Sequence, residues 1–329
     1  MSRRQDNRGH EEHSQPNNGT AGHRSGNLWR QMPQSNIWKA ILPAIVYILF
    51  CQIFLTASES LLQSGIAYVT QNAATVIGIQ NGGAGSAASM QGTLTDGMRQ
   101  FLILARFDLQ AAGTAVSALA AMYMTVRMLR VSPGLYRPLE PECRKGKRPS
   151  MLENGLMALC VLSGSVWLNA LLQGCGAVAA DAAASTAAGQ TMQVSLPVGL
   201  IVYGVAAPYA EEVIFRGITF EKLWGSTNSW ILGAAGSSLL FGICHGNFVQ
   251  GIYAWGMGMM LCCVLKRGES LKGVIFLHGA VNILTLVLSR ANAYNGIAGR
   301  MALFTGLGIF GCSIIGLYYL WKLESNGSA

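Results

Sequence analysis

Three apolar stretches of the sequence contain polar residues at helical spacing. The first includes EEVIFR, in which Glu212 precedes Arg216 by four residues, so both side chains lie on one helical face and can form an ion pair. Glu211 points about 100° away around the same helix and is free to face a cavity. We therefore expect Arg216 and Glu212 to organise a site in which Glu211 is the working carboxylate.

The other two stretches add imidazole and amide groups. In FGICH, His245 follows Phe241 by four residues, and in HGAVN, Asn282 follows His278 by four. Ionisable residues within membrane spans generally face the bundle interior and interact with one another. A carboxylate can take a proton from water, imidazoles can hold that water, and an imidazole with an amide can stabilise an oxyanion. This set of groups indicates hydrolysis.

The same residues raise the question of a metal ion. Two histidines and a glutamate match a catalytic zinc site with an open position, and the ligands would be Glu211, His245 and His278. A divalent metal such as zinc and a metal-free mechanism both stay open on this pattern. HExxH and GxSxG are absent from the sequence, as is a convincing nucleophilic cysteine arrangement. These absences argue against the common zinc, serine and cysteine proteases.

The composition places these motifs in a membrane. Of 329 residues, 51% are hydrophobic and 12% charged, whereas a soluble domain carries about 25% charged residues. A spanning helix needs about 20 mostly apolar residues. We expect an all-α, polytopic integral membrane protein with about eight transmembrane helices, at 40–57, 109–126, 155–173, 196–220, 230–245, 248–265, 271–289 and 302–321.

The chain divides into four predicted regions. Residues 1–37 lack the apolar core of a secretory signal and are predicted to form a disordered polar cytoplasmic tail. Residues 38–195 hold the first helices and their loops, and 58–107 is predicted to be a long loop without an assigned role. The motifs lie in 196–290, and 291–329 holds the last helix and a short tail.

The positive charge indicates orientation and partners. The net charge is +8, and the basic residues cluster beside apolar spans, most densely in RPLEPECRKGKRPS. This is the positive-inside pattern, so we expect a multi-pass protein, in the cell membrane if the host is a prokaryote, with both termini cytoplasmic. The expected partners are the lipid bilayer and a peptide or protein substrate, and not nucleic acid. The eight cysteines include no CxxC pair and are expected to be small buried hydrophobes.

In this order, EExxxR, FxxxH and HxxxN resemble the CPBP family of intramembrane proteases. That family includes the type II CAAX prenyl endopeptidases and proteins linked to bacteriocin processing and self-immunity. The resemblance covers about 196–290 and implies an intramembrane endopeptidase, called a metalloprotease in the family, with a conical active-site cavity.

The resemblance also implies a role for each motif residue. Glu211 would be the general base, and His245 would position the water or a metal. The oxyanion site would be formed by His278 and Asn282, and the architecture would be supported by Glu212 and Arg216.

Two other functional classes remain open. A transporter or channel could use the same buried groups as a proton relay, although it would be expected to show an internal repeat, and none is evident. A membrane scaffold or immunity protein could keep the fold and act only by binding. Prenylated CAAX proteins, bacteriocins, leader peptides and membrane-protein tails all fit as substrates.

Overall fold

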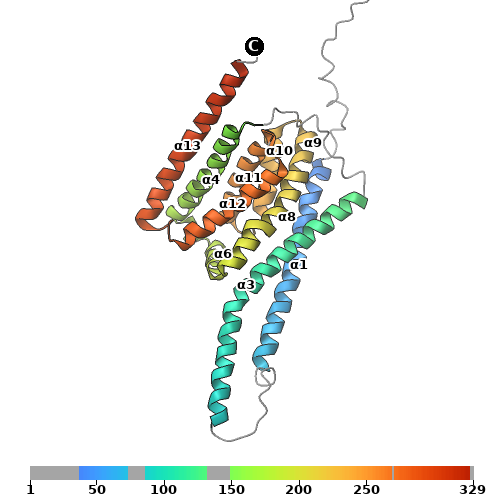
Figure 1. Cartoon of the computed structure of the whole chain (residues 1–329). Helices are drawn as coiled ribbons and strands as arrows, with labels where there is room; N and C mark the ends of the chain where they lie inside the picture. The colour runs from blue at the N-terminus through green and yellow to red at the C-terminus, as the bar shows by residue number, and fades with distance from the viewer. Residues whose placement is uncertain (1–36, 73–85, 132–148, 269, 327–329) are drawn as a thin grey trace, which may run out of the picture. The chain divides into compact units, whose positions relative to one another are not determined.

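The computed structural model describes residues 37–72, 86–131, 149–268 and 270–326, and within these ranges every regular element is a helix (Figure 1). The predicted tail 1–37 lies outside them except for its last residue. The longer helices are α1 (Ile37–Gln71), α3 (Ser86–Val131), α4 (Met151–Gly174), α10 (Trp230–Ile243), α11 (Phe248–Lys266), α12 (Leu271–Arg290) and α13 (Gly296–Asn326).

Seven helical stretches of the described chain are long and apolar enough to cross a membrane. The eighth predicted span is α10, which has 14 residues and is too short to cross a hydrocarbon core of about 30 Å. The protein is thus an all-α, polytopic membrane protein, as the composition predicts.

The long loop predicted at 58–107 is wrong. Helix α1 continues to Gln71 and α3 begins at Ser86, so most of this segment is helical, and α1 packs along α3 (Figure 1). Many residues of 58–107 are small or polar. They weaken the apolar pattern from which a span is predicted, but they do not break a helix. Residues 73–85 lie outside the described ranges.

The predicted fourth span is one helical rod with two wider turns in it. It consists of α7 (Leu196–Ile201), η3 (Val202–Ala206), α8 (Ala207–Ile214), η4 (Phe215–Phe220) and α9 (Glu221–Thr227). In η3 and η4 the backbone is π-helical, and the Ala207 N–H donates to the carbonyl of Val202, five residues earlier. Such turns occur frequently at functional sites. Here they flank the segment that carries Glu211 and Glu212.

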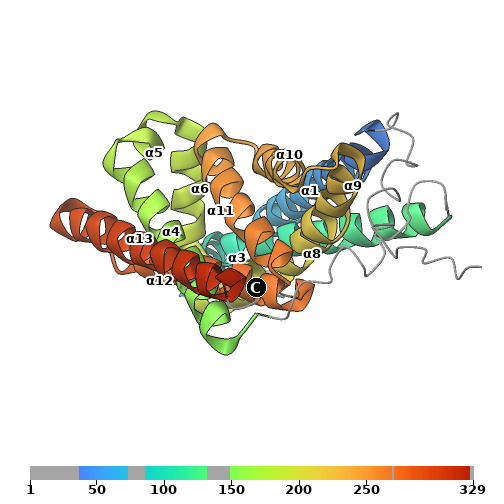
Figure 2. The ribbon, with the colours of Figure 1, turned by 90° about the horizontal axis from the view of Figure 1, so that it is seen from above.

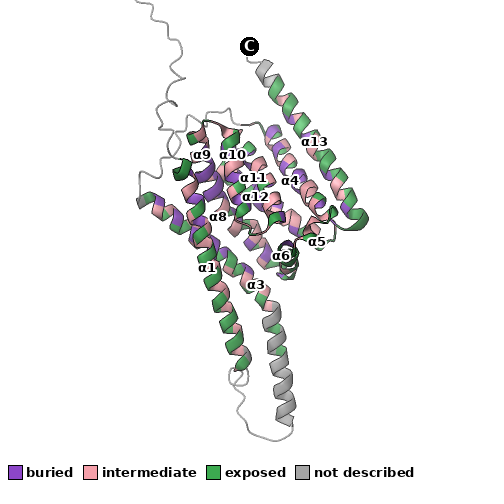
Figure 3. Cartoon of the chain, turned by 180° about the vertical axis from the view of Figure 1, so that it is seen from behind, coloured by how far each residue is buried: buried purple, intermediate pink, exposed green. Residues whose placement is uncertain are grey.

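Helix α8 lies inside the bundle, in contact with α1, α3 and α12. The main apolar core is formed around it by buried side chains such as Phe215 of η4, Phe241 of α10, Met257 of α11 and Val274 of α12. Buried residues gather on these helices, while much of α13 and of the second half of α1 is exposed (Figure 3). The helices that carry the polar motifs are therefore the same helices that form the apolar core.

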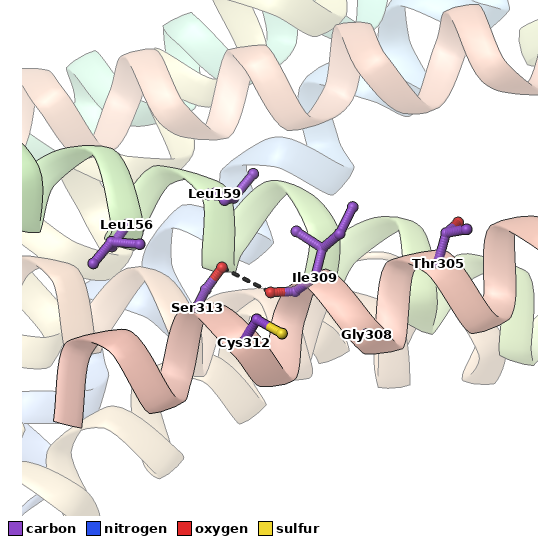
Figure 4. Close-up of a pocket in the computed structure, with 7 residues that line it drawn as sticks. All are labelled: Leu156, Leu159, Thr305, Gly308, Ile309, Cys312 and Ser313. Atoms are coloured by element: carbon purple, nitrogen blue, oxygen red, sulfur yellow. Dashed lines mark hydrogen bonds between the residues drawn. The ribbon is translucent and has the colours of Figure 1, made fainter. Parts of the chain in front are cut away.

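Helix α13 lies along the outer side of α4, which is its main neighbour (Figure 2). A groove of about 430 Å³ runs between the two helices and is lined by Leu156, Leu159, Thr305, Gly308, Ile309, Cys312 and Ser313 (Figure 4). The Ser313 hydroxyl donates to the Ile309 carbonyl at 2.8 Å. Because the lining contains neither carboxylate nor imidazole, this groove is not a candidate for hydrolysis.

Two short helices, α5 (Ala177–Ala180) and α6 (Ala182–Gln193), lie between the predicted spans 155–173 and 196–220. Asp181 accepts hydrogen bonds from the backbone N–H of Ala184 at 3.0 Å and of Val249 at 3.4 Å. The Ala184 N–H is the main cause that holds the pKa of Asp181 below its usual range, with the Val249 N–H adding to it. One carboxylate therefore ties the first turn of α6 to the first turn of α11.

Candidate active site

Glu212 lies at the centre of a buried network that joins two helices. Arg216 Nη1 donates to Glu212 Oε1 at 2.7 Å, and His278 Nδ1 lies 2.7 Å from the same oxygen. Glu212 and Arg216 are 0% exposed and His278 is 2% exposed. The carboxylate can only accept, so His278 Nδ1 carries a proton and donates it. Glu212 thus orients an α12 imidazole from α8 and is neutralised by Arg216.

The guanidinium of Arg216 has a fitted pocket. Its Cζ lies 4.4 Å from the centroid of the Phe241 ring, in a cation–π contact. A methyl group at Gly258 would lie 2.7 Å from Arg216 Nη2 and 2.8 Å from Ser238 Oγ, so glycine is required there for space. The Phe241 ring also makes edge contacts with His245 and His278, at centroid distances of 4.8 and 5.8 Å.

Glu211 has a different environment from its neighbour. Its side chain is 18% exposed, it lines a cavity, and its Oε2 lies 3.7 Å from His278 Nε2. Among the described side chains, no lysine or arginine is paired with it as Arg216 is with Glu212. Glu211 and Glu212 are consecutive on α8, so their side chains point in different directions. Glu212 is therefore buried and paired, and Glu211 faces the cavity.

The two motif histidines are anchored in the same way. His245 Nδ1 lies 2.9 Å from the Phe241 carbonyl, and because a carbonyl only accepts, this nitrogen carries the proton. His278 is anchored through Nδ1 to Glu212. In the neutral form each ring therefore offers the lone pair of Nε2, and both residues line the cavity that Glu211 faces.

Asn282 is held by a carbonyl that the π turn leaves free. Its Nδ2 donates to the Tyr203 carbonyl at 3.0 Å. The Ala207 N–H bonds to Val202, and Pro208, five residues after Tyr203, has no N–H to give. The carbonyl of Tyr203 is thus available to position the Asn282 amide, whose second N–H is left for a ligand.

The contact between α12 and η3 is a backbone contact. A Cβ on Gly279 would lie 2.1 Å from the Gly204 carbonyl oxygen. Since essentially no Cβ approaches an atom so closely, only glycine allows this separation, and the separation brings Asn282 within reach of Tyr203.

Gly279→Ala is expected to force α12 away from η3. We expect a destabilisation of about 1–3 kcal/mol, typical of overpacking. The hydrolysis that the motifs predict should fall about 100-fold, because a displacement of about 1 Å can cost that much. Thermal unfolding in detergent measures the first effect. Gly155→Ala on α4 is the control, since no atom lies within 4 Å of the added methyl group, and it should be neutral or stabilising. Equal melting temperatures for the two variants would contradict the close-contact argument.

The motif residues meet in one cavity of about 470 Å³. Glu211, His245, His278 and Asn282 all line it, and Glu212 and Arg216 lie outside it in the buried network. The structure thus brings together the six residues singled out from the sequence and divides them into four cavity residues and two buried ones.

The predicted metal ligands are of a suitable type but are not assembled as a metal site. Imidazole Nε2 atoms whose Nδ1 is hydrogen-bonded are typical of metal-binding histidines. However, in the part of the chain that the structure describes, no group of three or more His, Cys, Asp or Glu side chains is placed to hold a metal ion. We derive no step through a metal from this arrangement.

Comparison with known proteins finds relatives of this chain. Residues 193–284 match the family model described as type II CAAX prenyl endopeptidase Rce1-like. The matched segment contains all three motifs, with α8, α10, α11 and most of α12. This segment is therefore similar to the type II CAAX prenyl endopeptidase Rce1-like family. The recognition based on EExxxR, FxxxH and HxxxN is confirmed.

Part of the chain is also similar to a curated bacterial protein. "Putative membrane peptidase YdiL" of Bacillus subtilis (strain 168) is 30% identical over 94 residues, which cover 29% of this chain and 38% of that protein. The chain thus matches less than half of the length of this relative. No solved structure gives a significant match.

Several residues of the candidate site are not evident from the sequence. The carbonyl of Tyr203 takes part through its backbone, and Pro208 is the one signal that could have pointed to it. Tyr253 and Thr285 line the cavity, with their hydroxyl oxygens 3.4 Å apart. Their types are common in any span, so nothing in the sequence distinguishes them.

Proposed function

We propose that this protein is an intramembrane endopeptidase that hydrolyses peptide bonds of membrane-associated substrates with a water activated by Glu211. The observation that carries the proposal is the division between two adjacent carboxylates. Glu212 is fully buried and bonded to Arg216 and His278, whereas Glu211 faces the cavity. A base must reach water, and Glu211 is the carboxylate that does.

The proposed reaction proceeds through a tetrahedral intermediate. Glu211 removes a proton from water as the water oxygen bonds to the substrate carbonyl carbon. The carbonyl oxygen becomes an oxyanion, which the free N–H of Asn282 stabilises. His278 stabilises it as well in its doubly protonated, cationic form, with Nδ1–H on Glu212 and Nε2–H on the oxyanion. Glu211 then gives its proton to the leaving nitrogen as the C–N bond breaks. His245 accepts a hydrogen bond from the attacking water through Nε2.

CAAX-type processing and bacteriocin maturation or immunity are the physiological roles that the resemblance suggests for this activity. Either role would use cleavage of a peptide near a membrane. A water-lined site is needed within the bilayer because both the nucleophile and the peptide backbone are polar.

The direct test uses the purified protein in lipid vesicles with a mixture of synthetic peptides. In water enriched in ¹⁸O, we expect discrete products that carry ¹⁸O in the newly formed carboxyl group, detected by mass spectrometry. Intact peptides inside the vesicles would instead favour a transporter, and intact peptides bound to the protein would favour a scaffold. Either result would contradict the proposed function.

A further inference from the structure

The cavity extends from Glu211 towards one end of the helical bundle. Its outer lining is formed by Asn169 and Gln173 in the last turns of α4, Gln250 in the first turn of α11 and Ser289 in the last turn of α12. Helix α6, which follows α4 and α5, forms another part of the wall. We call this end of the bundle the α6 end.

The other end of the bundle carries most of the basic residues, and we call it the basic end. Helices α1 and α12 begin at this end, and α9, α11 and α13 end there. The basic residues near these termini are Lys39, Lys222, Lys266, Arg267, Lys272 and Lys322. On this end Lys266 lies 4.6 Å from the Trp230 ring and Arg267 bonds Glu153 at 2.8 Å.

The α6 end is much less basic. Among the described side chains, its helices carry Arg106, Arg290 and Arg300, and Arg290 donates to the carbonyl of Val194. Lysine and arginine near the ends of spans are retained on the cytoplasmic side. The charge distribution therefore places the basic end in the cytoplasm and the cavity mouth on the opposite face.

The wall of the cavity is neutral away from the motif residues. Its described lining contains no lysine or arginine, and it offers the amides of Asn169, Gln173 and Gln250 and small alanines of α6. Amides both donate and accept, as an extended peptide backbone requires. A free terminal carboxylate would find no cation there to pair with.

We propose that the site cleaves within an uncharged, extended polypeptide segment that reaches it from the non-cytoplasmic face. This inference rests on the proposed function. It differs from processing of a cytoplasmic tail in the side of the membrane from which the substrate enters. The proposed substrate also differs in how it is bound, because the site would contact the internal peptide backbone of the substrate and not its terminal carboxylate.

Cysteine labelling of intact cells tests the sidedness without any assay of activity. Ser185→Cys places an exposed thiol on α6, and Lys272→Cys places one at the exposed start of α12. With a membrane-impermeant maleimide and site-resolved mass spectrometry, we expect at least tenfold more labelling of the α6 thiol in intact cells, and equal labelling after lysis. Preferential labelling of the α12 thiol would overturn the proposal.

Peptide cleavage separates failure of this inference from failure of the proposed function. Neutral peptides with a free or an amidated carboxyl terminus should be cut within about twofold of each other by the protein in detergent. A requirement for the free carboxylate would overturn the substrate class while leaving the protease intact. No cleavage of any peptide, together with the expected labelling, would instead contradict the proposed function.

Discussion

Glu211→Gln is expected to lower peptide hydrolysis by about 100- to 10,000-fold, the usual contribution of a general base. Glutamine keeps the size and hydrogen bonding of the side chain but cannot take a proton from water. Since Glu211 faces the cavity and Arg216 is bonded to Glu212 instead, the variant should fold as the wild type does. Initial cleavage rates and melting temperatures in detergent measure the two effects.

A matched control makes the same change outside the cavity. Glu59 lies on α1, where its carboxylate accepts a hydrogen bond of 3.4 Å from Gln110. Glu59→Gln should keep wild-type hydrolysis to within about twofold. If Glu211→Gln were equally active while remaining folded, Glu211 would not be the base and the mechanism would need another residue in that role.

Arg216→Met is expected to destabilise the protein by about 3–5 kcal/mol, because it leaves a buried charge without its partner. Glu212 is 0% exposed, and the guanidinium also contacts the Phe241 ring. Loss of the cation should lower both the melting temperature and the yield of folded protein. Arg267→Met is the comparison, since Arg267 is 32% exposed in its pair with Glu153, whereas Arg216 and Glu212 are both 0% exposed. The loss of stability should therefore be smaller for Arg267→Met than for Arg216→Met.

The double variant Glu212→Leu, Arg216→Met separates structure from chemistry. Without either charge the site no longer contains an unpaired ion, so much of the stability should return. Hydrolysis should stay low, because His278 Nδ1 then lacks the carboxylate that orients its ring. Recovery of stability and full activity together would mean that the network only fills space.

The sequence was most informative where contacts are local. Glu212 and Arg216 are one helical turn apart, so their pairing follows from helix geometry. The grouping of the three motifs in one place followed from the cost of polar groups within apolar spans. Both inferences need only the identity and spacing of residues.

Contacts between distant elements could not be predicted in this way. The bond from Asn282 to the Tyr203 carbonyl depends on a π turn, on Pro208 and on the glycine contact between α12 and η3. The continuation of α1 through Gln71 depends on packing against α3, which the weak apolar pattern of 58–71 does not reveal. Tertiary packing decides both features.

The short helix α10 has a consequence for the surrounding lipid. Its 14 residues rise about 21 Å, and its exposed side chains include Ile231, Leu232, Leu239 and Ile243, which face outward as acyl-chain contacts do. A hydrocarbon layer of about 30 Å must become thinner to match it, at a fraction of a kcal/mol for each ångström. We therefore expect the bilayer to be thinner beside α10, whose last residue, Ile243, lies two positions before His245.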